Sequence, residues 1–218
     1  MGSRAQPRTG RLDRRTKQAR SERRDGRAAL LDAAAEVFAS RGLRDASVDE
    51  VAERAGYSKG AVYWHFESKD DLFLALLEER IDRPMREMIG LLESAPPEHD
   101  MGPEASRRFT ELLQTQRELL LLEHEYWSQA ARDPALRGRY RNRQARLRKA
   151  LGKALVTRFE HLGAPALGPA RGEAMATIVM GLAAGLARER LIDPEAVSDD
   201  LLGDALVLLY RGTAAEAH

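Results

Sequence analysis

Apolar residues recur every three or four positions along almost the whole chain, which is the spacing of an α-helix. Near the N-terminus this pattern covers residues 27–41 and stops at Gly42, a residue type that commonly ends helices. A proline-rich loop lies at 94–103. No stretch alternates apolar and polar residues over the length of a strand, so the sequence predicts an all-α protein. Beyond the loop, the predicted helices cover 104–116, 118–131, 135–162, 170–192 and 198–211.

The segment 47–69, SVDEVAERAGYSKGAVYWHFESK, predicts two short helices around a tight turn. Ser47 is a favourable N-cap, and Glu50 completes a capping box at the start of the first helix. Gly56 gives the backbone the freedom that a sharp turn requires, and Ser58 can cap the second helix. That second helix has a polar and aromatic side with no evident core to fill, which is typical of a helix-turn-helix recognition helix. The residues on that side are Lys59, Gly60, Tyr63, Trp64 and His65.

A long helix follows, which Ser68 can cap and which should kink or break at Pro84. The last two predicted helices are apolar over much of their circumference, so each needs more than one packing neighbour. Gly181 and Gly185 each lower helix stability by about 1 kcal/mol relative to alanine, a cost that the close approach of another helix backbone would explain. We therefore expect a homodimer through the last two helices. The alternative is that both helices only complete the chain's own core.

The composition narrows the possible classes of protein. Hydrophobic residues make up 43% of the 218, enough for a core, and the absence of cysteine excludes disulfides and thiolate metal sites. The sequence has no run of about 18 uncharged apolar residues, and its N-terminus lacks the apolar segment of a secretory signal. We therefore expect a cytoplasmic protein with no membrane partner. No histidine has a second ligand at metal-binding spacing, so neither a metal nor a cofactor is expected.

The net charge of +1 conceals a strongly basic N-terminus. Residues 1–27 contain ten Lys or Arg and three Asp or Glu, a net charge of +7, so the rest of the chain carries −6. We expect residues 1–24 to form a disordered arm. An arm of this charge in front of a DNA-reading element suits contact with phosphates or the minor groove. The alternative is a solvated tail that adds nothing to DNA affinity.

Three segments of the N-terminal third resemble the TetR/AcrR family of bacterial transcriptional regulators in order and spacing. They are LLDAAAEVFASRG (30–42), SVDEVAERAGYSKGAVYWHF (47–66) and ESKDDLF (67–73). The resemblance implies a helix-turn-helix DNA-binding domain at 25–70 and a helical ligand-binding and dimerisation domain at 71–218. It also implies a homodimer whose two recognition helices enter successive major grooves of a palindromic operator in double-stranded DNA.

Carried onto the matching positions, the resemblance assigns DNA contacts to residues of this chain. It implies that Ser47 and Lys69 bind phosphates, which their places at helix N-termini suit. Two positions depart from the usual pattern: Tyr57 stands where a small aliphatic is common, and Ala61 replaces a hydroxyl residue and offers only a methyl contact. The implied DNA-binding residues are Ser47, Ser58, Lys59, Gly60, Ala61, Tyr63, Trp64, His65 and Lys69. Without the surrounding motif, Tyr63 and Trp64 could instead be core residues.

In the resembling family the C-terminal helices enclose a ligand pocket, and ligand binding spreads the two DNA-reading heads. In this chain Glu123 falls in the middle of an apolar, aromatic helix stripe, where a carboxylate is costly to bury without a partner. It is either a pocket acid that selects cationic ligands, with the rings of Tyr126 and Trp127 beside it, or the ion-pair partner of an arginine. Arg143 and Arg158 both fall near the apolar side of a following helix. The residues expected to line the pocket are Phe109, Leu113, Gln116, Glu123, Tyr126, Trp127, Tyr140, Gln144 and Met175.

These features favour a homodimeric repressor that a small hydrophobic ligand, cationic if Glu123 faces the pocket, releases from its operator. The alternative is a constitutive DNA-binding regulator of the same fold with no small-molecule inducer. An enzyme is not expected, and no catalytic residue is assigned. The chain has no cysteine nucleophile, Ser-His-Asp arrangement, phosphate-binding loop or metal cluster that chemistry would require.

Overall fold

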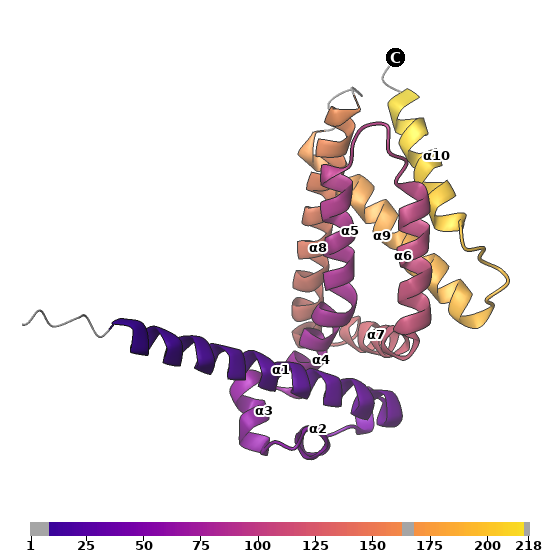
Figure 1. Ribbon diagram of the computed structural model, residues 1–218. Coiled ribbons are helices and arrows are strands. Elements are labelled where there is room, and N and C mark those ends of the chain that lie inside the picture. Colours follow the sequence, from indigo (N-terminus) through magenta and orange to yellow (C-terminus); the bar gives the residue numbers. More distant parts are fainter. Residues whose placement is uncertain (1–8, 163–167, 216–218) are drawn as a thin grey trace, which may run out of the picture. The chain divides into compact units, whose positions relative to one another are not determined.

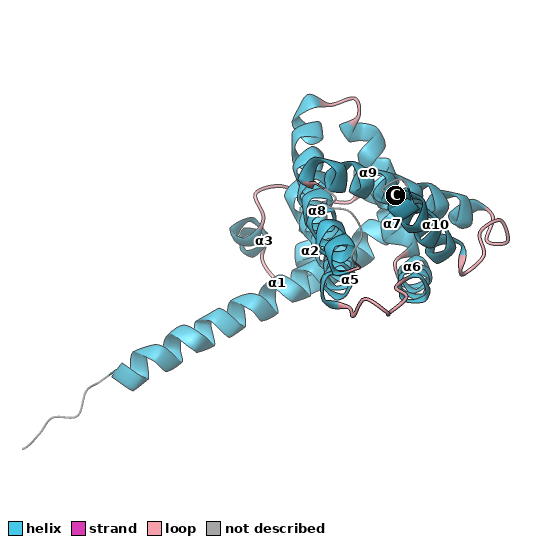
Figure 2. Ribbon diagram, turned by 90° about the horizontal axis from the view of Figure 1, so that it is seen from above, coloured by secondary structure: helices cyan, strands magenta, loops and turns pink. Residues whose placement is uncertain are grey.

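The computed structural model describes the backbone of residues 9–162 and 168–215 and the side chains of residues 25–162 and 168–212. Every regular element in these ranges is helical (Figures 1 and 2), so the all-α prediction is confirmed. The elements are α1 (Thr9–Asp45), α2 (Val48–Ala55), α3 (Lys59–His65), α4 (Lys69–Leu77), the π-helical segment η1 (Glu78–Asp82), α5 (Arg83–Ser94), α6 (Gly102–Thr115), α7 (Arg117–Ala130), α8 (Pro134–His161), α9 (Pro169–Ile192) and α10 (Leu201–Ala215).

The chain divides into two compact units, the first ending at Leu76 and the second beginning at Leu77. The sequence pattern places this boundary earlier, between residues 70 and 71. Most of α4 lies in the first unit because its apolar side chains complete that unit's core. Phe73 packs edge-to-face on Phe38 of α1, with ring centroids 5.6 Å apart. Other buried residues of this core are Leu30, Leu31, Ala34, Val51, Val62, Phe66, Leu72 and Leu76.

Helix α1 begins much earlier than the predicted start at residue 27. The backbone of residues 9–24, in the arm that was expected to be disordered, is helical, and residues 1–8 lie outside the described part. Arginine is a good helix former, which favours this extension of the helix. At the other end the regular helix stops where predicted, because Gly42 has non-helical angles (φ 75°, ψ 165°) that glycine adopts without strain.

The break predicted at Pro84 takes the form of η1 between α4 and α5. A proline ring clashes with the carbonyl four residues earlier and offers no N–H, so a regular α-helix cannot pass through it unchanged. Pro84 instead lies in the first turn of α5, where an N–H would have no partner in the helix. The π-helical segment buries both Ile81 and Asp82, and a buried aspartate requires a partner.

Helix α8 is central to the second unit, where it packs on α5, α7 and α9, while α6 packs on α10 (Figure 1). Two of these contacts depend on paired glycines. A Cβ on Gly172 of α9 would lie 2.8 Å from the carbonyl oxygen of Gly152 on α8. A Cβ on Gly203 of α10 would overlap the backbone of Gly102 on α6. Glycine therefore allows both helix pairs to approach more closely than any other residue would.

Gly181 and Gly185, for which the sequence predicted a close helix approach, make none with the part of this chain that the structure describes. A Cβ at either position would have no atom within 4 Å of it, apart from the helix's own backbone. The last two helices also expose large apolar side chains: Ile178 on α9 is 55% exposed and Leu208 on α10 is 69% exposed. The predicted apolar surface is therefore present on α9 and α10, and part of it is uncovered in a single chain.

Candidate nucleic-acid interface and ligand cavity

The start of α2 is held by the predicted capping box. The Ser47 hydroxyl accepts a hydrogen bond from the Glu50 amide (3.2 Å), and a Glu50 carboxylate oxygen accepts one from the Ser47 amide (2.9 Å). The hydrogen bonds that the Ser47 amide and hydroxyl donate to the Glu50 carboxylate lower its pKa. The helix ends at Gly56 in the left-handed conformation (φ 72°). The sharp turn between α2 and α3 is thus fixed by local contacts, as the sequence predicted.

Helix α3 turns its aromatic side outward. Ser58 caps it by accepting a hydrogen bond from the Ala61 amide (3.2 Å), and its buried residue is Val62. Tyr63 is 48% exposed and Trp64 is 60% exposed, so neither is a core residue. An exposed tyrosine and tryptophan on a two-turn helix directly after a tight turn are suited to contact with a nucleic-acid backbone.

Two lysines of the predicted DNA surface already have partners in the first unit. The ammonium of Lys59 pairs with Asp49 of α2 (2.9 Å), and this contact raises the pKa of Lys59. Lys69 donates to the backbone oxygens of Arg44 (3.0 Å) and Ala46 (2.9 Å), near the end of α1. An ammonium has three donors, so these two contacts leave Lys69 one further donor. Nothing in the spacing of residues indicates this second role, because the partners of Lys69 lie more than twenty residues away.

Tyr57, one of the two departures from the family pattern, lies beside α1. A Cβ on Gly26 would lie 3.4 Å from the Tyr57 hydroxyl oxygen and 3.8 Å from Nε2 of His65. The guanidinium of Arg27 lies 5.4 Å from the centre of the Phe66 ring. These contacts place Tyr57 and the α3 residue His65 next to the part of α1 that continues into the basic arm.

A cavity of about 1000 Å³ lies within the second unit, between α5, α6, α7, α8, α9 and α10. Its volume is at the upper end of the range for small-molecule sites. Of the predicted lining residues, the structure places six in its wall: Phe109, Leu113, Glu123, Trp127, Tyr140 and Gln144. The other three, Gln116, Tyr126 and Met175, are not part of the wall. Tyr126 is fully buried elsewhere, with its ring 6.1 Å from that of Tyr140.

Several wall residues escaped the sequence interpretation. The predicted lining residues lie on α6, α7 and α8, with one methionine of α9, but the wall also takes residues from α10. His124 lies in the wall, and its Nδ1 is 2.9 Å from the Leu120 oxygen. Further wall residues that were not predicted include Leu151, Leu155, Met180 and Tyr210.

Glu123 is both a wall residue and an ion-pair partner. Its Oε1 accepts from a terminal nitrogen of Arg143 (2.6 Å) and from the Tyr140 hydroxyl (3.1 Å), and Gln144 donates to that hydroxyl in turn (2.9 Å). The predicted alternatives, pocket acid and paired glutamate, thus describe the same residue. Burial and the Glu123 charge together raise the pKa of Tyr140, so it remains a neutral hydrogen-bond donor.

The second partner of Arg143 is Asp82 of η1, which the sequence did not suggest. Nε of Arg143 lies 2.9 Å from Oδ2 of Asp82, and a terminal nitrogen lies 2.5 Å from Oδ1, so the pair is bidentate. Burial disfavours charge on both groups. Burial, with a smaller effect of the Glu123 charge, raises the pKa of Asp82 although Arg143 lowers it, whereas for Arg143 the two carboxylates outweigh burial and its pKa is raised.

Arg158 has no carboxylate partner among the described residues. Its two terminal nitrogens donate to four backbone oxygens of the loop after α5: Ala95 (2.7 Å), Pro96 (2.7 Å), Pro97 (3.3 Å) and His99 (2.6 Å). Arg158 therefore ties that loop to α8 and is not the partner of Glu123. Its guanidinium is buried and lies in the cavity wall.

In the part of the chain that the structure describes, no three His, Asp or Glu side chains are grouped so that they could hold a metal ion. No described helix combines the length and hydrophobicity needed to cross a membrane.

Comparison with known proteins places residues 30–76 in the family of bacterial regulatory proteins, tetR family. The transcriptional activator FasR of Mycolicibacterium smegmatis is 49% identical over 63 residues, which are 29% of this chain and 29% of FasR. The matches to the first curated relatives span less than half of their length, and those relatives are transcriptional regulators, not enzymes.

Solved structures resemble the chain over most of its length. A TetR-family member from Streptomyces coelicolor A3 has the same fold, with a TM-score of 0.63, 24% identity, and coverage of 84% of this chain and 97% of that one. The multidrug binding protein EbrR complexed with ethidium has a TM-score of 0.60 and 25% identity, with the same coverage. The helix-turn-helix geometry of α2 and α3 agrees with these matches: residues 30–76 match the N-terminal domain of the bacterial regulatory proteins of the tetR family, and the rest of the chain shares the fold of the solved structures.

Proposed function

We propose that this chain is a DNA-binding transcriptional regulator that acts as a homodimeric repressor and leaves a palindromic operator when a small, largely apolar ligand binds. The observation that carries the proposal is the outward aromatic face of α3, where Tyr63 and Trp64 are 48% and 60% exposed and follow a capped tight turn. The DNA-binding residues are those assigned from the sequence. A protein with this role acts in the cytoplasm.

Homodimerisation is supported by the surfaces of α9 and α10. Ile178 on α9 and Leu208 on α10 are large apolar side chains that are exposed and lie outside the cavity wall. A two-fold axis through these helices makes a self-complementary interface of the kind that symmetric dimers use. Two recognition helices related by that axis would match the two halves of a palindrome.

Ligand control is supported by the cavity of the second unit, whose wall is mostly apolar and carries a small set of polar groups. A structural neighbour of this chain, EbrR, is a multidrug binding protein solved with ethidium. The second candidate function is a constitutive regulator of the same fold. It has no observation in its favour beyond the helix-turn-helix, and the cavity counts against it.

The deciding experiment is a footprint of the full-length protein on the DNA upstream of its own gene, repeated with cationic, neutral and anionic amphiphiles. Protection of a palindrome that one ligand class removes supports repression released by ligand. Protection that persists with every compound supports the constitutive regulator, and no protected palindrome contradicts the proposal. The matched variants are Tyr63→Ala, which should lose protection, and Tyr210→Phe in the second unit, which should keep it.

A further inference from the structure

The first two-thirds of α8 carry a dense positive charge. Residues 134–153 include eight Lys or Arg and no Asp or Glu, a net charge of +8. Since the whole chain carries +1 and residues 1–27 carry +7, all other residues together carry −14. Arg143 is buried with its two carboxylates, and Arg148 is only partly exposed. The other six are exposed and form the α8 basic face: Arg137, Arg139, Arg141, Arg146, Lys149 and Lys153.

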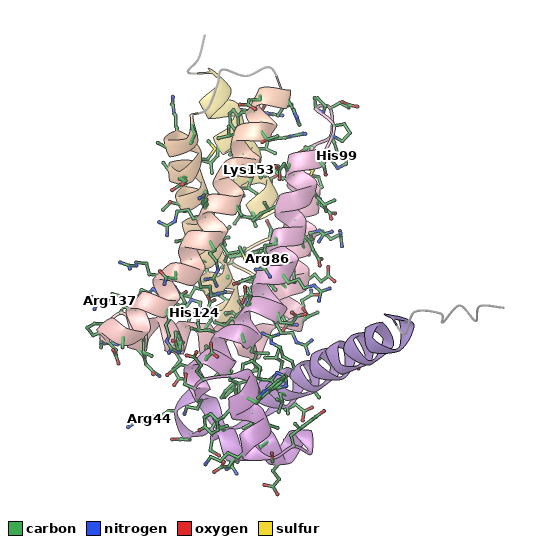
Figure 3. The ribbon with its side chains drawn as sticks, turned by 90° about the vertical axis from the view of Figure 1, so that its left-hand side faces the viewer. Arg44, Arg86, His99, His124, Arg137 and Lys153 are labelled. Atoms are coloured by element: carbon green, nitrogen blue, oxygen red, sulfur yellow. The ribbon has the colours of Figure 1, made fainter. Side chains whose placement is uncertain are left out.

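These six side chains cover the outer side of α8. At about 100° per residue they occupy an arc of about 200°, and the buried residues Arg143 and Leu147 lie on the opposite side. From Arg137 to Lys153 the arc is about 24 Å long, at about 1.5 Å per residue. Figure 3 shows α8 with Arg137 near its start and Lys153 farther along it. The α8 basic face is therefore a continuous strip of positive charge.

Most of this charge has no carboxylate to balance it. Arg137, Arg141 and Lys149 have no carboxylate partner among the described residues. Lys153 pairs with a glutamate of α5 (2.8 Å), and Arg146 lies 3.9 Å from a glutamate of η1. The side chains of these two residues are still 74% and 64% exposed, so both remain accessible to a further anion.

Other arginines of the second unit are neutralised within their own part of the chain. Arg83 on α5 pairs with two glutamates, Arg107 on α6 does the same, and Arg190 on α9 pairs with an aspartate. On α8, by contrast, like charges lie four positions apart, as in Arg137 with Arg141, and repel each other on the helix surface. A surface that served only solubility could interleave acids as α5 and α6 do. The unbalanced strip is better explained by an anionic partner.

The chemistry of the strip fits the phosphates of duplex DNA. Four of its six side chains are arginines, whose planar guanidinium matches a phosphate group. A strip of about 24 Å runs past about seven phosphates of one DNA strand. Along α8, all of which the structure describes, no large apolar side chain is exposed. Membrane-surface helices and the cores of protein interfaces use such side chains, whereas contact with a DNA backbone does not require them.

We propose that the α8 basic face is a second DNA-binding surface of this chain, which binds the phosphates of duplex DNA without regard to base sequence. The helix-turn-helix selects the operator, and the α8 basic face adds affinity for any duplex that reaches it. This goes beyond the proposed function, because it requires no palindrome, no dimer and no ligand.

Trace acetylation of the full-length wild-type protein, read by mass spectrometry, tests the proposal without any substitution. The chain has five lysines: Lys17, Lys59, Lys69, Lys149 and Lys153. Lys59 and Lys69 report on the helix-turn-helix and the start of α4, and the last two report on α8. With a long duplex of shuffled sequence at low salt, we expect Lys149 and Lys153 to lose reactivity. They should regain it as salt displaces the protein from phosphates.

The same labelling separates this proposal from the proposed function. Protection of Lys59 and Lys69 with no protection of Lys149 and Lys153 would overturn the second surface and leave the helix-turn-helix intact. Protection of Lys149 and Lys153 alone would support the second surface and contradict DNA binding by α3. Vesicles of phosphatidylglycerol replace the duplex in a parallel measurement. Protection of Lys149 by vesicles but not by the duplex would overturn the assignment to DNA.

Salt titrations of a neutralised variant count the phosphates involved. Arg137→Gln, Arg141→Gln and Lys149→Gln together remove the three cations that have no carboxylate partner. We expect this triple variant to bind the shuffled duplex more weakly, with a slope of log affinity against log salt smaller by up to about 2.7, or about 0.9 for each phosphate. An unchanged slope would overturn the proposal, and the lysine labelling of wild-type protein decides the matter if the variant does not fold.

The matched control removes the same charge from other helices of the second unit. It combines Arg107→Gln on α6, Arg171→Gln on α9 and Arg211→Gln on α10, all exposed positions. We expect its slope to equal that of the parent protein. An equal fall in slope for both triple variants would show that only net charge matters, and would overturn the assignment of a surface to α8.

Discussion

Arg143 is held by two carboxylates that are 20 and 61 positions away in the sequence. The spacing of apolar residues predicted Glu123 in a helix stripe and named Arg143 as a partner, but it offered no reason to consider Asp82. Asp82 points inward because it lies in a π-helical segment, and a local change of helical register leaves no signal in a period of 3.6 residues. Signals that depend on close neighbours, such as the Ser47 capping box and the turn at Gly56, were predicted correctly.

The Glu50 carboxylate should make the stability of the first unit depend on pH. Its pKa is lowered in the folded chain by hydrogen bonds from Ser47, so its contribution is present above the ordinary value of 4.5 and is lost as pH falls through the folded pKa. We expect Glu50→Gln to lower the unfolding free energy at pH 7 but not at pH 3, measured by urea denaturation. Glu53→Gln is the control and should show no such difference, and equal effects of Glu50→Gln at both pH values would contradict the prediction.

Tyr63→Ala should weaken operator binding by up to about tenfold, the effect of losing one hydrogen bond of roughly 0.5–1.5 kcal/mol. The melting temperature should be unchanged because the side chain is half exposed. Val62→Ala removes the neighbouring buried side chain and should lower the melting temperature instead. Gel-shift titration and thermal unfolding measure the two effects. A fall in melting temperature for Tyr63→Ala would show that this residue belongs to the core.

At the scale of elements, periodicity predicted the helices well and their neighbours poorly. The predicted helices 118–131 and 135–162 begin and end within one residue of α7 and α8. The face predicted from α7 nevertheless contained both Trp127, which lines the cavity, and Tyr126, which does not. An apolar stripe is wide enough to serve the core and a cavity at once, and only the packing of the other helices decides which residue does which.

The glycine crossing between α8 and α9 should tolerate no side chain. We expect Gly172→Ala to lower the unfolding free energy by about 1–3 kcal/mol, since its Cβ would meet the Gly152 oxygen. Gly181→Ala, on the same helix with open space around it, should raise helix stability by up to about 1 kcal/mol under conditions where the chain is monomeric. Urea denaturation measures both. A Gly172→Ala protein as stable as the parent would show that α8 and α9 are not this close in solution.

The basic arm should contribute to DNA affinity by neutralising phosphates. Deleting residues 1–20 should weaken operator binding and reduce the slope of log affinity against log salt by about 0.9 for each phosphate that the arm neutralises. Titrations at several salt concentrations measure the slope. Deletion of the C-terminal residues 216–218 is a control that should leave it unchanged. An unchanged slope after removal of residues 1–20 would mean that the arm does not bind DNA.

At the scale of the whole molecule, the two units differ in how far the sequence predicts their function. The first unit matches the model of the tetR family over residues 30–76. The DNA contacts expected of its exposed residues could therefore be assigned from the sequence. The second unit has the family's fold, but its cavity wall is drawn from six helices. The composition of such a wall depends on how all of these helices pack together. The apolar stripe of a single helix therefore predicts only part of it, and the structure is needed for the rest.

The homodimer predicted from α9 and α10 can be tested at their exposed surface. Leu208→Asp places a charge on an apolar side chain that is 69% exposed in the single chain. We expect this variant to be monomeric by sedimentation equilibrium and to lose tight operator binding, because a palindrome then meets only one recognition helix at a time. Leu91→Asp on α5, also exposed, should remain dimeric. A dimeric Leu208→Asp protein would place the interface elsewhere.

The paired glycines at the two helix crossings also limit how this protein can diverge. At Gly152 with Gly172, and at Gly102 with Gly203, both partners are already the smallest residue, so an enlargement on one side cannot be compensated by a reduction on the other. Ordinary core positions change in compensating pairs, but these four should stay fixed in descendants that keep the fold. Gly181 and Gly185 are free of that constraint within the chain. Because they line the cavity, they should change together with its other wall residues, and a collection of close homologues would reveal the two patterns.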